Sequence, residues 1–183
     1  RPLVFVPVYI GYEKLMEGSS YVAELHGRPK QSESLTGLLG AARLLKRNFG
    51  KVHVNFGPPL ALAEFLDAQH PAWREESFDA QAPWLRSAVD ATATALARGI
   101  NALAVVNPVN LLAVTLLSTP KHAADVRLLQ KQIEHVQYLL TETPYAGSIV
   151  RCELSASEVI DYVRRLDLVE CCPHPLGDMI REG

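Results

Sequence analysis

The 183-residue sequence is poor in the residues that build disulfide scaffolds and metal centres. Its three cysteines are Cys152, Cys171 and Cys172, and an odd number with two adjacent members makes a poor disulfide framework. A reducing compartment is therefore favoured. His174 lies close to the adjacent pair, but no second Cys or His pair stands at the spacing of a zinc site, so we expect no metal site.

Strong net charge and long uninterrupted apolar runs are also missing. The formal net charge is −2, so the chain as a whole should not attract nucleic acid or anionic lipid over long range. The most apolar long run, residues 100–117, is interrupted by Asn101, Asn107, Pro108 and Asn110, which makes it too polar for a transmembrane helix. There is no secretory signal, and the start at Arg1 directly before an apolar strand indicates an internal stretch of a longer protein.

Two strand patterns are present near the start of the chain. Residues 3–10 are almost continuously apolar, which is typical of a strand buried on both faces of a parallel sheet. Pro7 lacks the N–H that a central ladder needs, so either a bulge or an unpaired face is expected there, and Gly11 should let the chain leave the strand. Residues 51–57 alternate with period two and predict a second strand. The order strand, helix, strand predicts an α/β sheet with a crossover.

The remaining sequence is mostly helical in pattern. Apolar residues at helical spacing predict helices at residues 21–27, 34–48, 62–69, 84–106, 110–117 and 123–141. Ser155 and Glu158 form a capping-box signature for a helix that ends near residue 166, and residues 168–171 could form a final strand. We therefore predict part of an α/β domain at 1–60, a connecting segment at 61–83 and a helical domain at 84–183.

Two short segments carry a resemblance to a known family. Residues 6–13 read Val-Pro-Val-Tyr-Ile-Gly-Tyr-Glu, and residues 54–59 read Val-Asn-Phe-Gly-Pro-Pro. The first resembles the fourth sequence block of the glycerolipid acyltransferases, in the extended form of the large bacterial glycerol-3-phosphate 1-O-acyltransferases. The second resembles the strand and turn that follow that block. The resemblance implies the C-terminal part of that family's α/β sheet, followed by a mostly helical domain.

The resemblance also implies a reaction, but not that this chain performs it alone. The family transfers a fatty acyl group from acyl-CoA or an acyl carrier protein to the 1-hydroxyl of glycerol 3-phosphate, without a further cofactor, at the cytoplasmic face of the inner membrane. Its general base is a His in an HxxxxD pattern. None of the six histidines here has an Asp five residues on, and the near miss, His70 with Glu75, follows the block instead of preceding it. We expect no catalytic residue here, with the His and Asp upstream and this stretch alone inactive.

By the same resemblance, the block strand should contribute substrate contacts. In open α/β sheets, ligands bind beyond the carboxyl ends of the strands. The expected substrate-binding residues are Pro7, Tyr9, Gly11, Tyr12 and Glu13. For the apolar part of the strand, plain core packing is the competing interpretation. Glu13 could instead cap the next helix or orient a substrate-binding cation.

Other functions stay open from the sequence alone. A non-catalytic interaction module is the main alternative, because a truncated sheet edge seeks a partner strand. A hydrolase that uses His70 and Glu75 is another. For an intact enzyme, the expected partners are glycerol 3-phosphate, an acyl thioester or acyl carrier protein, and a membrane surface.

Nucleic acid is not among the expected partners. The helices from residue 110 onward and the possible final strand could suggest a helix-turn-helix or winged-helix module. DNA binding would need a basic recognition face. The capped helix instead carries Glu158 and Asp161 beside Arg164 and Arg165.

Overall fold

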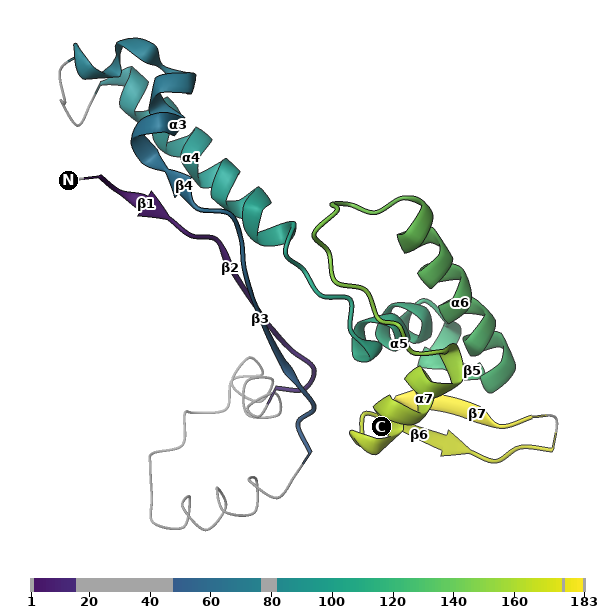
Figure 1. The fold of residues 1–183 in the computed structure, drawn as a ribbon. Helices are drawn as coiled ribbons and strands as arrows, with labels where there is room; N and C mark the ends of the chain where they lie inside the picture. Colours follow the sequence, from purple (N-terminus) through teal and green to yellow (C-terminus); the bar gives the residue numbers. More distant parts are fainter. Residues whose placement is uncertain (1, 16–47, 77–81, 176, 183) are drawn as a thin grey trace, which may run out of the picture. The chain divides into compact units, whose positions relative to one another are not determined.

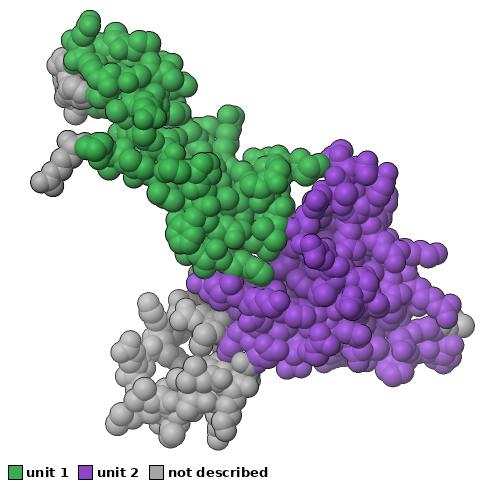
Figure 2. Space-filling model, viewed as in Figure 1, with its two compact units in different colours: residues 1–11, 53–105, 144–150 green, residues 12–52, 106–143, 151–183 purple. Residues whose placement is uncertain are grey.

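The computed structural model describes residues 2–15, 48–76, 82–175 and 177–182. These residues divide into two compact units (Figure 2). Unit 1 comprises residues 1–11, 53–105 and 144–150, and unit 2 comprises residues 12–52, 106–143 and 151–183. The helices predicted at 21–27 and 34–48 lie outside the described residues, apart from residue 48. The domain boundaries predicted for the chain stay a prediction.

Short antiparallel strands replace the parallel sheet that the apolar run predicted. Strand β1 (Val4–Phe5) pairs antiparallel with β4 (Leu60–Ala61), and β2 (Val8–Tyr12) forms a second two-stranded sheet with β3 (Val52–Phe56) (Figure 1). The parallel prediction for residues 3–10 was therefore wrong. A continuous apolar run shows that both faces of a strand are apolar, but it carries no information about the direction of the neighbouring strand.

The strand pairing is interrupted at Pro7. Phe5 is paired with Leu60, and the backbone N–H of Gly57 donates to the carbonyl of Pro7 at 2.8 Å. Pro58 and Pro59 lie between these two points, and β1–β4 and β2–β3 are separate two-stranded sheets. Neither Pro58 nor Pro59 has a backbone N–H to donate, so strand pairing cannot continue through these two residues.

The helices of unit 1 follow β4 directly. They are α3 (Leu62–Gln69), the 3₁₀ turn η1 (Pro71–Arg74) and α4 (Pro83–Asn101). Helix α3 has the predicted bounds, whereas α4 ends five residues before the predicted end. A turn at residues 102–103 follows α4 instead, and Val105 then forms a parallel bridge with Val150. The bridge requires an extended backbone at Val105, and Pro108 disfavours a helical conformation in the residue before it. Residues 105–107 are therefore not helical.

Unit 2 joins three helices to a three-stranded antiparallel sheet in the order β5-β7-β6. The order helix, strand, helix, helix, strand, strand is that of a winged helix. Its elements are α5 (Pro108–Leu117), η2 (Pro120–His122), β5 (Ala123–Asp125), α6 (Val126–Glu142), α7 (Ala156–Arg165), β6 (Val169–Cys172) and β7 (Met179–Glu182).

One hydrophobic core holds the helices of unit 2 on its sheet. Leu129 and Ile133 of α6 and Val159 of α7 have no exposed surface, and Leu112 of α5 and Ile180 of β7 are 1% exposed. Burial of this many aliphatic side chains is the main stabilising term for a unit of this size.

Capping residues explain where the helices of unit 2 begin. Asn107 and Asn110 form a reciprocal capping box around Pro108, so the Asn-Pro segment that interrupts the apolar run is the start of α5. Ser155 and Glu158 form the predicted box at the start of α7. Helix α6 begins three residues later than predicted, because residues 123–125 pair with β7 as strand β5. No described helix is long and apolar enough to cross a membrane.

Candidate functional site

Pro7 is buried inside unit 1, where glycines make room for its ring. A Cβ added at Gly99 of α4 would lie 3.0 Å from Pro7 Cγ, and one added at Gly57 would lie 3.4 Å from Pro7 Cβ. The ring therefore packs directly on the backbone of α4 and of the turn after β3. These contacts are close packing of the kind found in a protein interior, and whether Pro7 also meets a substrate stays a prediction.

Tyr9 and Gly11 are the two predicted site residues that the structure brings together. The Tyr9 ring covers Gly11 so closely that a Cβ on Gly11 would lie 2.6 Å from the Tyr9 hydroxyl oxygen. Gly11 lies within β2 and does not end it, so its predicted role in leaving the strand was wrong. What its missing side chain provides is space for the tyrosine ring two residues before. Tyr12, the next residue, is 55% exposed.

Glu13 is a buried carboxylate within unit 2. Its side chain is 5% exposed, and its Oε2 accepts a hydrogen bond from the Tyr162 hydroxyl at 2.5 Å and one from the Lys51 backbone N–H at 2.7 Å. Its own backbone N–H donates to the Lys51 carbonyl at 3.1 Å. Burial, and after it the hydrogen bond to Glu13, raises the pKa of Tyr162 to about 12. The phenol is therefore a neutral donor to the carboxylate at physiological pH.

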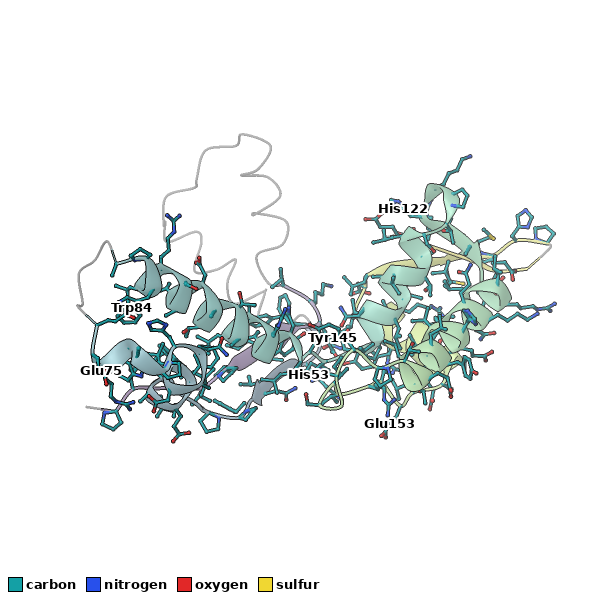
Figure 3. All side chains as sticks on the ribbon, turned by 90° about the horizontal axis from the view of Figure 1, so that it is seen from above. His53, Glu75, Trp84, His122, Tyr145 and Glu153 are labelled. Atoms are coloured by element: carbon teal, nitrogen blue, oxygen red, sulfur yellow. The ribbon has the colours of Figure 1, made fainter. Side chains whose placement is uncertain are left out.

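An apolar pocket of about 480 Å³ lies within unit 1. It is formed by β1 with the residue stretch before it, by α3 and η1, and by α4 from Trp84, labelled in Figure 3, to Leu96. The lining includes Phe5, Leu66, Trp73, Trp84, Ala88 and Leu96. Its size is in the range of small-molecule sites, and its walls are almost entirely apolar. Sequence reasoning missed it, because the lining comes from three separate segments, each of which looks like ordinary core.

The alternative of a hydrolase with a dyad of His70 and Glu75 finds no such pair in the structure. His70 Nε2 lies 2.6 Å from Oε1 of Glu76, and its ring stacks on Trp84 with centroids 5.5 Å apart. Glu75 follows η1, and its backbone N–H donates to the Ala72 carbonyl. The imidazole is therefore fixed by an aromatic stack and the neighbouring glutamate.

Polar contacts also fix the indole of Trp73 at the end of the pocket. Its Nε1–H donates to Asp67 Oδ1 at 2.8 Å, and the Arg74 guanidinium lies 4.6 Å from its ring centroid. Arg74, and secondly Trp73, holds the pKa of Asp67 below its usual value. Within the described ranges, no group of three or more His, Cys, Asp or Glu side chains could hold a metal ion, and the three cysteines are free thiols.

Sequence comparison decides the family. The family described as "Glycerol-3-phosphate acyltransferase C-terminal region" matches residues 21–183. This chain belongs to that family. A glycerol-3-phosphate acyltransferase of Xanthomonas campestris pv. campestris is 46% identical over 183 residues, and one of Pseudomonas putida is 42% identical over 181 residues.

Family membership confirms the resemblance carried by the block strand. The family match starts at residue 21, but the two relatives each align with 98% of this chain, so the alignments extend upstream of that match. The chain spans only 21% and 22% of the length of those relatives. The acyltransferase C-terminal region described here is thus about a fifth of a relative's polypeptide.

Proposed function

We propose that this chain is part of a glycerol-3-phosphate 1-O-acyltransferase of phospholipid biosynthesis. The intact enzyme would transfer a fatty acyl group from acyl-CoA or acyl carrier protein to the 1-hydroxyl of glycerol 3-phosphate, at the cytoplasmic face of the inner membrane. The observation that carries the proposal is the family match over residues 21–183, together with relatives named for this activity. The catalytic His and Asp would lie upstream. A non-catalytic interaction module is not favoured.

The apolar pocket of unit 1 supports the proposal, because a fatty acyl chain is a ligand that needs no polar partner. Each methylene moved from water into such a pocket contributes about 0.8 kcal/mol. We propose that the pocket between β1, α3 and α4 receives part of the acyl chain. The donor's thioester would then be presented to catalytic residues outside this chain.

A pair of alanines on α4 allows a matched test in the longer protein. Both alanines are exposed, but Ala93 lines the pocket and Ala97 does not. Ala93→Leu adds three carbon groups to the pocket lining. Displacement of about two methylenes of the acyl chain by them should raise the KM for a palmitoyl donor on the order of tenfold. Ala97→Leu should leave the KM unchanged.

Donor length separates the pocket assignment from the activity itself. A lauroyl donor, which is shorter, should be much less affected by Ala93→Leu than the palmitoyl donor. If both variants keep the wild-type KM for both donors, the pocket does not bind the acyl chain. That result would leave the acyltransferase proposal intact. Absence of any glycerol-3-phosphate-dependent consumption of acyl thioester by the longer protein would overturn the proposal as a whole.

A further inference from the structure

The surroundings of Glu13 are organised around its carboxylate. A charged group that is 5% exposed is costly unless it is hydrogen-bonded, and here one oxygen accepts both the Tyr162 hydroxyl and the Lys51 amide. Gly50, directly before Lys51, has a φ of 70°. A Cβ at that position would collide with Glu13 Oε2 and lie 2.9 Å from Glu13 Cβ. The glycine therefore lets the backbone approach the carboxylate.

A second set of contacts ties the same segment to helix α7. The Lys14 ammonium donates to the carbonyl of Leu166, the residue that caps α7. Within α7 itself, the guanidinium carbon of Arg165 lies 5.8 Å from the Tyr162 ring centroid, which holds the ring that Glu13 contacts. Residues 13–14, 50–51 and the last turn of α7 are thus joined by several independent contacts within unit 2. We call Glu13, Gly50, Lys51 and Tyr162 the Glu13 joint.

We propose that Glu13 is a positioning residue of the acyltransferase, which fixes the end of the block strand β2 to helix α7 through Tyr162 and the Lys51 amide. The effect on the reaction rests on the proposed function, because the joint would act by holding Tyr12, the predicted substrate-contacting residue that directly precedes it within unit 2. The carboxylate itself would not touch substrate. This differs from the expectation that Glu13 binds substrate or orients a substrate-binding cation.

Conservative variants distinguish the two roles. Glu13→Gln keeps an oxygen that can accept the Tyr162 and Lys51 bonds, whereas Glu13→Ala removes both. If Glu13 positions the strand, Tyr162→Phe should reproduce much of the Glu13→Ala defect and Glu13→Gln should largely rescue it. If the charge binds substrate directly, Glu13→Gln should be as defective as Glu13→Ala, and Tyr162→Phe should resemble the wild type.

The test uses the longer protein and two readouts. The first is hydrogen exchange of the Lys51 backbone amide, which should become about tenfold faster in Glu13→Ala, because a bond to a charged acceptor is lost. The second is acyl transfer. In Glu13→Ala, the KM for glycerol 3-phosphate should rise about tenfold while kcat stays within twofold of the wild type. In Tyr162→Phe, the same KM should rise by a smaller factor. Tyr138→Phe, an exposed tyrosine on α6, is the matched control and should change neither.

Each result bears on a different part of the proposal. Unchanged Lys51 exchange in Glu13→Ala would show that the joint does not form, whatever the activity. Faster exchange with wild-type kinetics would show a joint with no role in positioning, and would also overturn the proposal. If the longer protein had no acyltransferase activity at all, the proposed function and the positioning role would both fall, while the exchange measurement would still report whether the joint forms.

Discussion

Two adjacent leucines on α6 allow a quantitative test of how unit 2 is packed. Leu129 has no exposed surface and belongs to the core of unit 2, whereas Leu128 is 50% exposed. Leu129→Ala removes three carbon groups from a fully buried site, which costs about 2.4 kcal/mol in transfer free energy. The cavity left behind raises the expected loss in free energy of unfolding to about 3–4 kcal/mol.

The neighbouring substitution controls for the change in helix composition. Leu128→Ala makes the same chemical change one residue earlier, and it should cost less than about 1 kcal/mol, because much of that side chain is already in water. Urea unfolding of both variants followed by far-UV circular dichroism would measure the difference. Equal midpoints for Leu128→Ala and Leu129→Ala would refute the assignment of Leu129 to the core and, with it, the packing of α6 on α5 and α7.

Two further predictions concern α7. Ser155→Ala should lower the free energy of unfolding by about 1 kcal/mol, measurable by urea unfolding. It should also return the pKa of Glu158, which the bonds from Ser155 lower, toward its usual value, and an unchanged carboxyl titration by NMR would contradict the capping box. The raised pKa of Tyr162 predicts that this tyrosine contributes stability below pH of about 10 and that the contribution is lost as pH rises toward about 12. Ultraviolet titration should show one late-ionising tyrosine that disappears in Tyr162→Phe.

Local signals in the sequence predicted several elements well. The capping box at Ser155 and Glu158 marked the start of α7, and the alternation of residues 51–57 marked β3. The interruption of the strand pairing at Pro7 was expected from the missing N–H of proline. In each case, the determining chemistry lies within a few residues of the element itself.

Pairings between distant segments could not be predicted in this way. Strand β5 was taken for the first turn of α6 and β7 was not predicted, because three or four residues become a strand only when a partner strand lies beside them. The sequence predicted a role for Glu13 in substrate contact, helix capping or cation orientation. Its partner Tyr162 lies 149 residues later in the sequence. No local pattern relates the two.

The apolar pocket illustrates the same limit for the candidate site. No local pattern in the sequence brings Trp73 and Trp84 together with Phe5 in one pocket. The pocket arises because β1, α3 and α4 leave a space of about 480 Å³ between apolar surfaces. Such a space depends on the distance between elements, which composition and periodicity do not contain.

The most direct test of the central claim compares the longer protein with this 183-residue chain in the same acyl-transfer assay. Labelled glycerol 3-phosphate and a palmitoyl thioester would be incubated with each, and the 1-acyl product would be counted. We predict glycerol-3-phosphate-dependent product from the longer protein and none above background from this chain, because no histidine here is followed by the Asp of the catalytic pattern. Product formed by this chain alone, or none formed by the longer protein, would contradict the account.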